Sequence, residues 1–367
     1  ETELKFDATE TKIHLEDLAE ELDIEAVEPE VSLRQGAVGE FVVAEGVEGR
    51  SVDIDALYAS LVEKVEQGDF EPITIPFTVT QPTKTKAEVE ENLVLRGVGT
   101  TRFTGTANRI HNLNKAVGII NGELGYYKLA PGAVFTTDDT LGDRTAANGW
   151  QKAGAYLNGT VTQDYGGGIC QVSSTLYNGV LKAGLEIVER SSHSMPVGYL
   201  NDRRGLDAAI DRHNLDMRFK NNTDHDIYVI GYINNSSAVI SFYIYGAPLE
   251  DGVDEIVLSS YQTGTIQPGA EQIIEDPTKP VGYSEVQVPR RVGERWAAFR
   301  HYMKNGEEVK KEELRSTTYR AFAGRRVVGT MVVETPTPEP TDQTQPTAPD
   351  QPTDQPQPTA PEVMEDP

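Results

Sequence analysis

The sequence predicts a multidomain α+β protein, and three observations carry that prediction. With 367 residues, the chain is long enough for two or three domains. Stretches with apolar residues at helical spacing occur beside stretches that alternate with period two, so helices and antiparallel strands are both expected. Residues 335–367 hold ten of the 21 prolines and no Lys or Arg, which predicts a disordered tail after the folded part.

Residues 1–98 are predicted to form an N-terminal α+β domain. Apolar side chains recur at helical spacing over 13–19 and 54–62, whereas 39–43 and 73–79 have the composition of short strands. Nothing in this segment has the appearance of a catalytic motif.

Residues 99–250 are predicted to form the central α+β domain. A helix is expected from Ala107, because Ile110, Leu113 and Val117 fall on one face. From residue 215 the pattern changes to period two, and strands over 227–233 and 238–245 are joined by an Asn-Asn-Ser turn. This arrangement predicts an antiparallel sheet that follows the helices.

Residues 255–334 are predicted to form an elongated all-β module. The segment is rich in β-branched and aromatic residues, and Asn305-Gly306 between two strand-like runs is a hairpin signal.

The composition excludes several classes of protein. A formal charge of −25 argues against binding to nucleic acid or to anionic lipid, since both require positive charge. The single cysteine excludes an internal disulfide and a cysteine-built zinc site. No apolar run approaches the ~20 residues of a membrane span. The chain starts at Glu1 and not at Met, which is compatible with a secretion signal or membrane anchor upstream.

The most informative motif surrounds that single cysteine. Gly166-Gly167-Gly168 leads directly into Ile169-Cys170, and helical spacing begins there. Glycines let the backbone approach a ligand closely, and the positive end of a helix favours the thiolate form of cysteine. This pattern is typical of a nucleophile, although a small buried side chain packed against glycines would give the same pattern.

A thiol nucleophile needs a base and a group that orients the base. His193 follows Cys170, and an acidic residue, Asp207 or Asp211, comes next. The order Cys, His, Asp is that of papain-like thiol enzymes. Chain order does not establish proximity, so a buried structural histidine remains the alternative. A metal-dependent hydrolase is a third option, but no close-spaced ligand pair supports it, and we expect no metal and no cofactor.

Ligand contacts are predicted from two clusters. Arg109 is suited to bind a carboxylate or phosphate, and His111 beside it is suited to hydrogen-bond sugar or peptide. The second cluster lies around the cysteine and consists of Gly166, Gly167, Gly168, Gln171 and Ser173.

The central motifs resemble the VanW family, which is named for an accessory protein of vancomycin-resistance gene clusters. The resemblance rests on Gly-Gly-Gly-Ile-Cys-Gln-Val-Ser-Ser-Thr-Leu-Tyr-Asn at 166–178, on His-Ser-Met-Pro-Val at 193–197 and on Phe-Lys-Asn-Asn-Thr at 219–223. Where the family has Gly-Arg-Asp-Ala-Thr, this chain has Arg-Gly-Leu-Asp-Ala-Ala at 204–209. The shared Asp-Ala favours Asp207 over Asp211 as the third group.

The flanking segments also resemble known modules. Gly46, Val52-Asp53 and the Ile-Thr-Ile-Pro at 73–76 are similar to a peptidoglycan-binding domain that often precedes VanW domains. Residues 275–330 are similar to a glycine-named, wall-associated β module that is implicated in binding polymers containing N-acetylglucosamine.

These resemblances imply an extracellular protein that lies in the cell wall or is anchored to the membrane on the outer face of a Gram-positive cell, with peptidoglycan or another wall polymer as partner. They imply either a papain-like thiol amidase, peptidase or acyl transferase acting on stem peptides, or a non-catalytic wall-binding scaffold linked to glycopeptide-antibiotic resistance or envelope maintenance.

Overall fold

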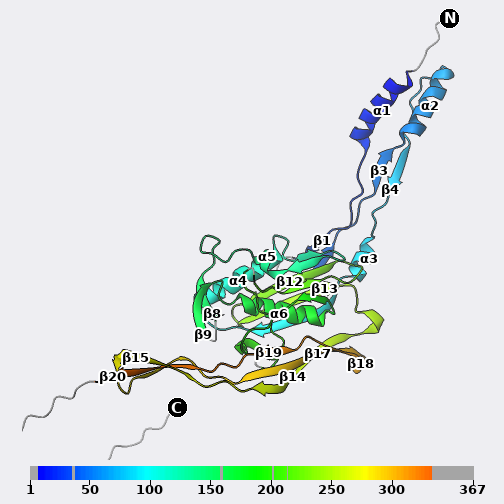
Figure 1. The fold of residues 1–367 in the computed structure, drawn as a ribbon. Coiled ribbons are helices and arrows are strands. Elements are labelled where there is room, and N and C mark those ends of the chain that lie inside the picture. The colour runs from blue at the N-terminus through cyan, green and yellow to red at the C-terminus, as the bar shows by residue number, and fades with distance from the viewer. Residues whose placement is uncertain (1–6, 35–37, 158–159, 201, 213, 333–367) are drawn as a thin grey trace, which may run out of the picture.

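The computed structural model describes residues 7–34, 38–157, 160–200, 202–212 and 214–332, and its elements form a central body with two slender arms (Figure 1). One arm carries the first two helices, and the other carries strands from the C-terminal part of the chain. The predicted multidomain α+β class is confirmed. The tail predicted at 335–367 lies outside the described residues.

The N-terminal arm has its own small core. Helices α1 (Ala8–Leu22) and α2 (Ile54–Glu66) pack together above the antiparallel ribbon of β3 (Gly49–Val52) and β4 (Phe77–Thr80). Leu15, Ala19, Val52 and Leu57 are its buried apolar residues. Both predicted helices are confirmed, whereas the last strand begins at residue 77 and not at 73.

The centre of the body is a four-stranded antiparallel sheet in the order β5 (Val94–Arg102), β13 (Val239–Gly246), β12 (Ile227–Asn234) and β6 (Tyr127–Leu129). Helices α4 (Ala107–Asn121) and α6 (Ile169–Lys182) pack on one face. The hairpin of β1 (Val31–Leu33) and β2 (Phe41–Val43) packs on the other, near the short helix α3 (Lys86–Glu91). Successive side chains of β12 and β13 therefore enter two different cores, as the period-two pattern predicts.

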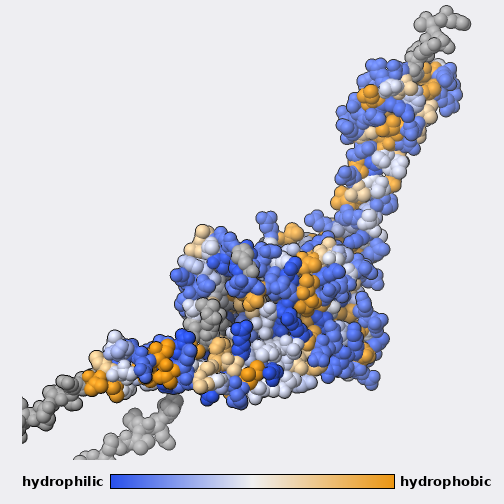
Figure 2. Space-filling view, viewed as in Figure 1, coloured by the Kyte–Doolittle hydropathy of each residue, from blue (hydrophilic) through white to orange (hydrophobic). Residues whose placement is uncertain are grey.

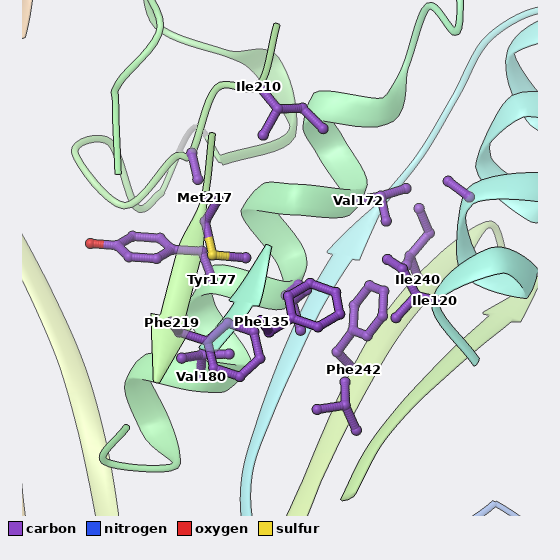
Figure 3. Packing of buried hydrophobic residues seen from close by; sticks show 14 of the residues in the cluster. Ile120, Phe135, Val172, Tyr177, Val180, Ile210, Met217, Phe219, Ile240 and Phe242 are labelled. Carbon is purple, nitrogen blue, oxygen red and sulfur yellow. The ribbon is translucent and has the colours of Figure 1, made fainter. Parts of the chain in front are cut away.

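Helix α6 is buried on nearly all sides. Figure 3 shows Val172, Tyr177 and Val180 of this helix among the aromatic rings of the core. The helix crosses β5 at close range, because a Cβ on Gly99 would lie 2.0 Å from the carbonyl oxygen of Thr175. Its position is therefore fixed by backbone contact, which in turn fixes the position of its first turn.

A second layer covers the other side of α6. It contains the three-stranded sheet of β10 (Glu186–Glu189), β11 (Arg218–Lys220) and β7 (Val134–Thr136), which leads into α5 (Thr137–Leu141). Phe135 and Phe219 stack within this layer at 5.1 Å between ring centroids (Figure 3). The hairpin of β8 (Lys152–Leu157) and β9 (Thr160–Tyr165) runs directly into the glycines before α6.

The C-terminal module consists of two sheets. The first contains β14 (Glu255–Ile266), β17 (Gly293–Lys304), β18 (Glu307–Glu313) and β19 (Thr317–Tyr319). It packs against the body, where Ala298 joins the main core and Arg300 donates to the carbonyl of Leu185 at 2.8 Å. The predicted Asn305-Gly306 hairpin is confirmed, with both residues at positive φ.

The second sheet of this module forms the other arm. Its strands are β15 (Gln272–Pro280), β20 (Arg325–Met331) and β16 (Ser284–Val288). Figure 2 shows apolar groups on the surface of this arm, among which Ile273, Val281 and Val286 are exposed.

Candidate active site

Cys170 occupies the first turn of α6, and the three preceding glycines are needed to place it there. Gly166 and Gly168 adopt positive φ of 77° and 108°, a region that favours glycine. A Cβ on Gly167 would lie 2.3 Å from the carbonyl oxygen of Ala153 on the adjacent hairpin. The loop therefore turns sharply against β8 and delivers a half-buried thiol at the N-terminal end of a helix.

The residues predicted as base and orienting group are in direct contact. The Nδ1 atom of His193 lies 2.7 Å from the Oδ2 atom of Asp207, and the backbone N–H of His193 donates to the same oxygen at 2.7 Å. Both side chains are buried, Asp207 completely. Two hydrogen bonds to one carboxylate oxygen fix the position and the orientation of the imidazole. Asp211, the alternative from the sequence, instead accepts from the side chain of Asn214.

The second carboxylate oxygen of Asp207 is held by two residues from other parts of the chain. The hydroxyl of Tyr319, on β19 of the C-terminal module, donates to Oδ1 at 2.7 Å. The guanidinium of Arg190 lies 3.3 Å from the same oxygen and also donates to the backbone carbonyl of Asp207. A buried carboxylate with this many donors is held in its ionised form.

The titration of Cys170, His193 and Asp207 is coupled. Burial raises the pKa of the Cys170 thiol, but its hydrogen bond with His193 and the charge of the imidazolium outweigh burial and bring the pKa below its ordinary value. For His193, burial by itself lowers the pKa, but hydrogen bonds with Asp207 and Cys170 outweigh burial and raise the pKa to about 9. The pKa of Asp207 falls to about 2, because His193 and Arg190 oppose the effect of burial. The arrangement favours a thiolate and imidazolium pair.

The thiol and the imidazole open onto a common cleft of about 1470 Å³. The N-terminal end of α6 forms one wall, and the β8–β9 hairpin forms another. The C-terminal module contributes residues on both sides of β19. The cleft is therefore built by the central body and the C-terminal module together.

Comparison with known proteins identifies the three parts of the chain. Residues 108–243 match the family described as "VanW like protein". The central part of the chain is a VanW-like domain. Residues 1–74 match the family described as "Putative peptidoglycan binding domain", and residues 260–331 match the G5 domain. The resemblances stated from the sequence are confirmed for all three parts.

Two curated relatives share the VanW-like domain. The uncharacterised protein YoaR of Bacillus subtilis (strain 168) is 34% identical over 136 residues, which are 37% of this chain and 43% of the relative. The vancomycin B-type resistance protein VanW of Enterococcus faecalis (strain ATCC 700802 / V583) is 29% identical over 120 residues, which are 32% of this chain and 42% of the relative. The matches thus span less than half of each curated relative.

Two solved structures are similar to the G5 part. The G5 domain of IgA1 protease is 22% identical, with a TM-score of 0.16, and the match covers 21% of this chain and 90% of that chain. The G5 domain of HP0197 is 17% identical, with a TM-score of 0.12, and the match covers 21% of this chain and all of that one.

Most of the ligand contacts predicted from the sequence line the cleft of the VanW-like domain. They are Arg109, Gly166, Gly167, Gly168 and Gln171. Arg109 donates to the Oε1 atom of Gln171 at 2.7 Å. The side-chain Nε2 of Gln171 donates to the carbonyl oxygen of Arg102, also at 2.7 Å. Gln171 therefore connects the arginine to the helix start and holds it at the cleft.

Two predicted contacts lie elsewhere. His111 is exposed outside the cleft, where its Nε2 atom is 2.9 Å from the carbonyl oxygen of Gly149. Ser173 is fully buried, and its hydroxyl donates to the carbonyl oxygen of Ala208 at 2.7 Å. Ser173 thus anchors the loop that carries Asp207 to helix α6, which is a structural role.

Several residues of the site were not predicted from the sequence. Tyr319 and Arg190 hold Asp207, and Tyr199 donates to the backbone carbonyl of Cys170 at 3.0 Å. Arg315 and Arg320 reach the cleft from the G5 module. Arg190 lies only three residues before His193, but nothing in the sequence indicates that its side chain reaches Asp207. Arg315, Tyr319 and Arg320 lie far from both motifs in the sequence, where no local pattern marks them.

The residues that the structure describes contain neither a metal-binding group nor a helix that could span a membrane. Within them, no group of three or more His, Cys, Asp or Glu side chains is placed to hold a metal ion. None of the helices in the same part of the chain is both long and apolar enough to cross a membrane.

Proposed function

We propose that this chain is a peptidoglycan-binding protein of the cell envelope whose VanW-like domain carries out thiol-dependent acyl transfer on stem peptides. The observation that carries the proposal is the contact network of Cys170, His193 and Asp207 at the wall of an open cleft. A purely structural cysteine does not require an imidazole partner that is itself oriented by a buried carboxylate.

In the proposed reaction the Cys170 thiolate attacks an amide carbonyl of the stem peptide. A bond forms between sulfur and carbon, and the negative charge moves to the carbonyl oxygen at the positive end of α6. When that charge returns, the carbon–nitrogen bond breaks, and the His193 imidazolium gives its proton to the leaving amine. Because Nδ1 faces Asp207, Nε2 is the ring nitrogen assigned to this transfer.

The acyl group is then carried as a thioester on Cys170. Neutral His193 takes a proton from water or from an incoming amine, which attacks the thioester carbon and releases the thiolate. Water as acceptor gives hydrolysis, whereas an amine from a second stem peptide gives a new amide bond. Either outcome regenerates the thiolate and imidazolium pair.

The flanking parts of the chain support the choice of substrate. A peptidoglycan-binding domain and a G5 domain on either side of the VanW-like domain would hold the cleft against wall polymer. These domains favour an extracellular location at the cell wall. The name of the Enterococcus faecalis relative connects that protein with vancomycin resistance, and we extend this setting to the present chain as part of the proposal.

The reaction is tested with purified peptidoglycan and the full chain. Wild type and Cys170→Ala protein are incubated with it, and the muropeptides are profiled by mass spectrometry. Arg295→Ala serves as the control, because Arg295 is exposed on β17 and does not line the cleft. We expect new or lost muropeptides with wild type and with the control, but not with Cys170→Ala.

Wall binding is tested separately by co-sedimentation with insoluble peptidoglycan. We expect Cys170→Ala protein to be retained as strongly as wild type, because binding is assigned to the flanking domains. Retention together with identical muropeptide profiles would instead favour a non-catalytic wall scaffold. Absence of retention for both proteins would refute the wall-binding part of the proposal.

A further inference from the structure

The wall of the cleft that belongs to the C-terminal module carries two arginines, one before and one after β19. From their positions we infer that Arg315 and Arg320 form a carboxylate-binding subsite beside Cys170, which recognises a carboxylate of the stem peptide. This inference deepens the proposed function and rests on it for the identity of the substrate.

The placement of the two arginines is set by the strand between them. Thr317 is buried, and its hydroxyl accepts from Arg190 at 2.8 Å, whereas Tyr319 is buried against Asp207. The backbone N–H of Arg320 donates to the carbonyl oxygen of Ser194, the residue after His193, at 2.8 Å. Arg315 and Arg320 are exposed and line the cleft. The strand thus fixes Arg320 beside the residue that follows His193, and it places both arginines on the wall of the cleft that holds Cys170.

The charge of the cleft is opposite to that of the chain. Seven arginines and four aspartates line it, with no lysine or glutamate, although the chain as a whole has a formal charge of −25. Arg144 forms an ion pair with Asp138, and Arg212 forms ion pairs with Asp138 and Asp143. Among the described residues, the side chains of Arg315 and Arg320 have no hydrogen bond or ion pair. Their guanidinium groups are therefore available to a ligand.

The chemistry of a guanidinium pair defines the ligand. A planar guanidinium donates two parallel hydrogen bonds to a carboxylate, which provides orientation as well as affinity. A peptide that places an amide carbonyl at Cys170 also carries a carboxylate at its chain end. Binding that carboxylate at Arg315 and Arg320 would fix which amide of the peptide meets the thiolate.

The test measures binding without chemistry, using full-length Cys170→Ala protein and isothermal titration calorimetry. The probes are one stem peptide with a free C-terminal carboxylate and the same peptide as its C-terminal carboxamide. We expect the carboxamide to bind about tenfold more weakly, since it loses the charge-assisted hydrogen bonds. Replacing Arg315 or Arg320 by Ala in this background should weaken carboxylate binding by a similar factor and reduce the difference between the probes.

Arg295→Ala is the matched control, because Arg295 is exposed on β17 directly opposite Thr318 but does not line the cleft. It should leave both affinities unchanged. Equal binding of the two probes by the parent protein, or an unchanged preference in Arg315→Ala and Arg320→Ala, would overturn the inference. Displacement of the carboxylate peptide by inorganic phosphate at equal concentration would also overturn it, since the site would then be a general anion site.

The binding test of the arginine subsite and the muropeptide test of acyl transfer can fail independently of each other. A preference for the carboxylate that depends on the arginines, combined with identical muropeptide profiles for wild type and Cys170→Ala, refutes acyl transfer and leaves the subsite intact. Altered profiles without any preference refute the subsite and leave acyl transfer intact.

Discussion

Replacing Asp207 with Asn removes the charge that keeps His193 protonated. The pKa of His193 is raised from 6.5 to about 9, and burial acts in the opposite direction. One pH unit corresponds to about 1.36 kcal/mol, so Asp207 and Cys170 together stabilise the imidazolium by about 3 kcal/mol or more. Without the Asp207 charge, we expect the pKa of His193 to fall toward or below 6.5.

The loss of the imidazolium raises the pKa of the Cys170 thiol, because the thiolate loses its positive partner. We therefore expect the rate of alkylation by iodoacetamide at pH 7.5 to fall about tenfold or more in Asp207→Asn, and the midpoint of the rate profile to move to higher pH. Alkylation of intact protein is followed by mass spectrometry across pH 5–10, and circular dichroism checks that the variant is folded.

Asp211→Asn is the matched control for this measurement. Asp211 also lines the cleft and carries the same charge, but it is exposed and bound to Asn214. We expect its profile to be that of wild type. A folded Asp207→Asn protein with an unchanged midpoint would refute the electrostatic account of the thiol, as would equal effects of the two substitutions.

The pH dependence of the reaction and substitutions at Tyr319 and Gly167 test the same contacts. As pH rises through about 9, the rate of acyl transfer should decline, because the His193 imidazolium that protonates the leaving amine is lost. The rate of thiolate alkylation should stay constant over the same range. Both rates are measured across the same pH series, and a decline of both would contradict the prediction. Tyr319→Phe should lower the free energy of unfolding, measured by urea titration, by about 1–3 kcal/mol, because the buried Asp207 carboxylate loses a hydrogen-bond donor. It should also slow acyl transfer. Unchanged stability and an unchanged rate would refute the role of Tyr319 in positioning Asp207. Gly167→Ala should lower the free energy of unfolding by about 2 kcal/mol or more, because the added Cβ would clash with the backbone of Ala153. Gly118→Ala is the control, because Gly118 lies on an open face of α4, and it should not lower the melting temperature.

The start of α6 was predictable because its determinants are local. Three consecutive glycines followed by helical spacing specify a sharp turn into a helix, and the structure has Gly168 as the residue before Ile169–Lys182. The contact between His193 and Asp207 was expected only from chain order and a family resemblance. Their proximity depends on a loop that is tied to α6 through Ser173, which no local pattern encodes.

Helix geometry explains why the predicted ligand contacts His111 and Ser173 lie outside the cleft. Arg109 and His111 are two residues apart on α4, a rotation of about 200° on a helix, so only one of them can face the cleft. Ser173 lies almost one turn further into α6 than Cys170, where the helix is already covered. The sequence identified the correct helices but not the faces that they present.

The contribution of the C-terminal module could not be predicted from the sequence at all. Tyr319 lies 112 positions after Asp207, and the segment around it has only the composition of a short strand. Its role arises because β19 pairs with β17 and is packed against Arg190 and Gly205. A long-range contact of this kind depends on the docking of two parts of the chain.

In the proposed reaction the sulfur of Cys170 becomes acylated by a stem peptide. The most direct measurement is the intact mass of the full-length protein shortly after mixing with soluble muropeptides, at pH 6 to slow turnover of the thioester. We expect an added mass equal to the acyl part of the peptide, located on Cys170, released by hydroxylamine and absent from Cys170→Ala. Muropeptide turnover by wild type without such an adduct, or an equal adduct on Cys170→Ala, would contradict it.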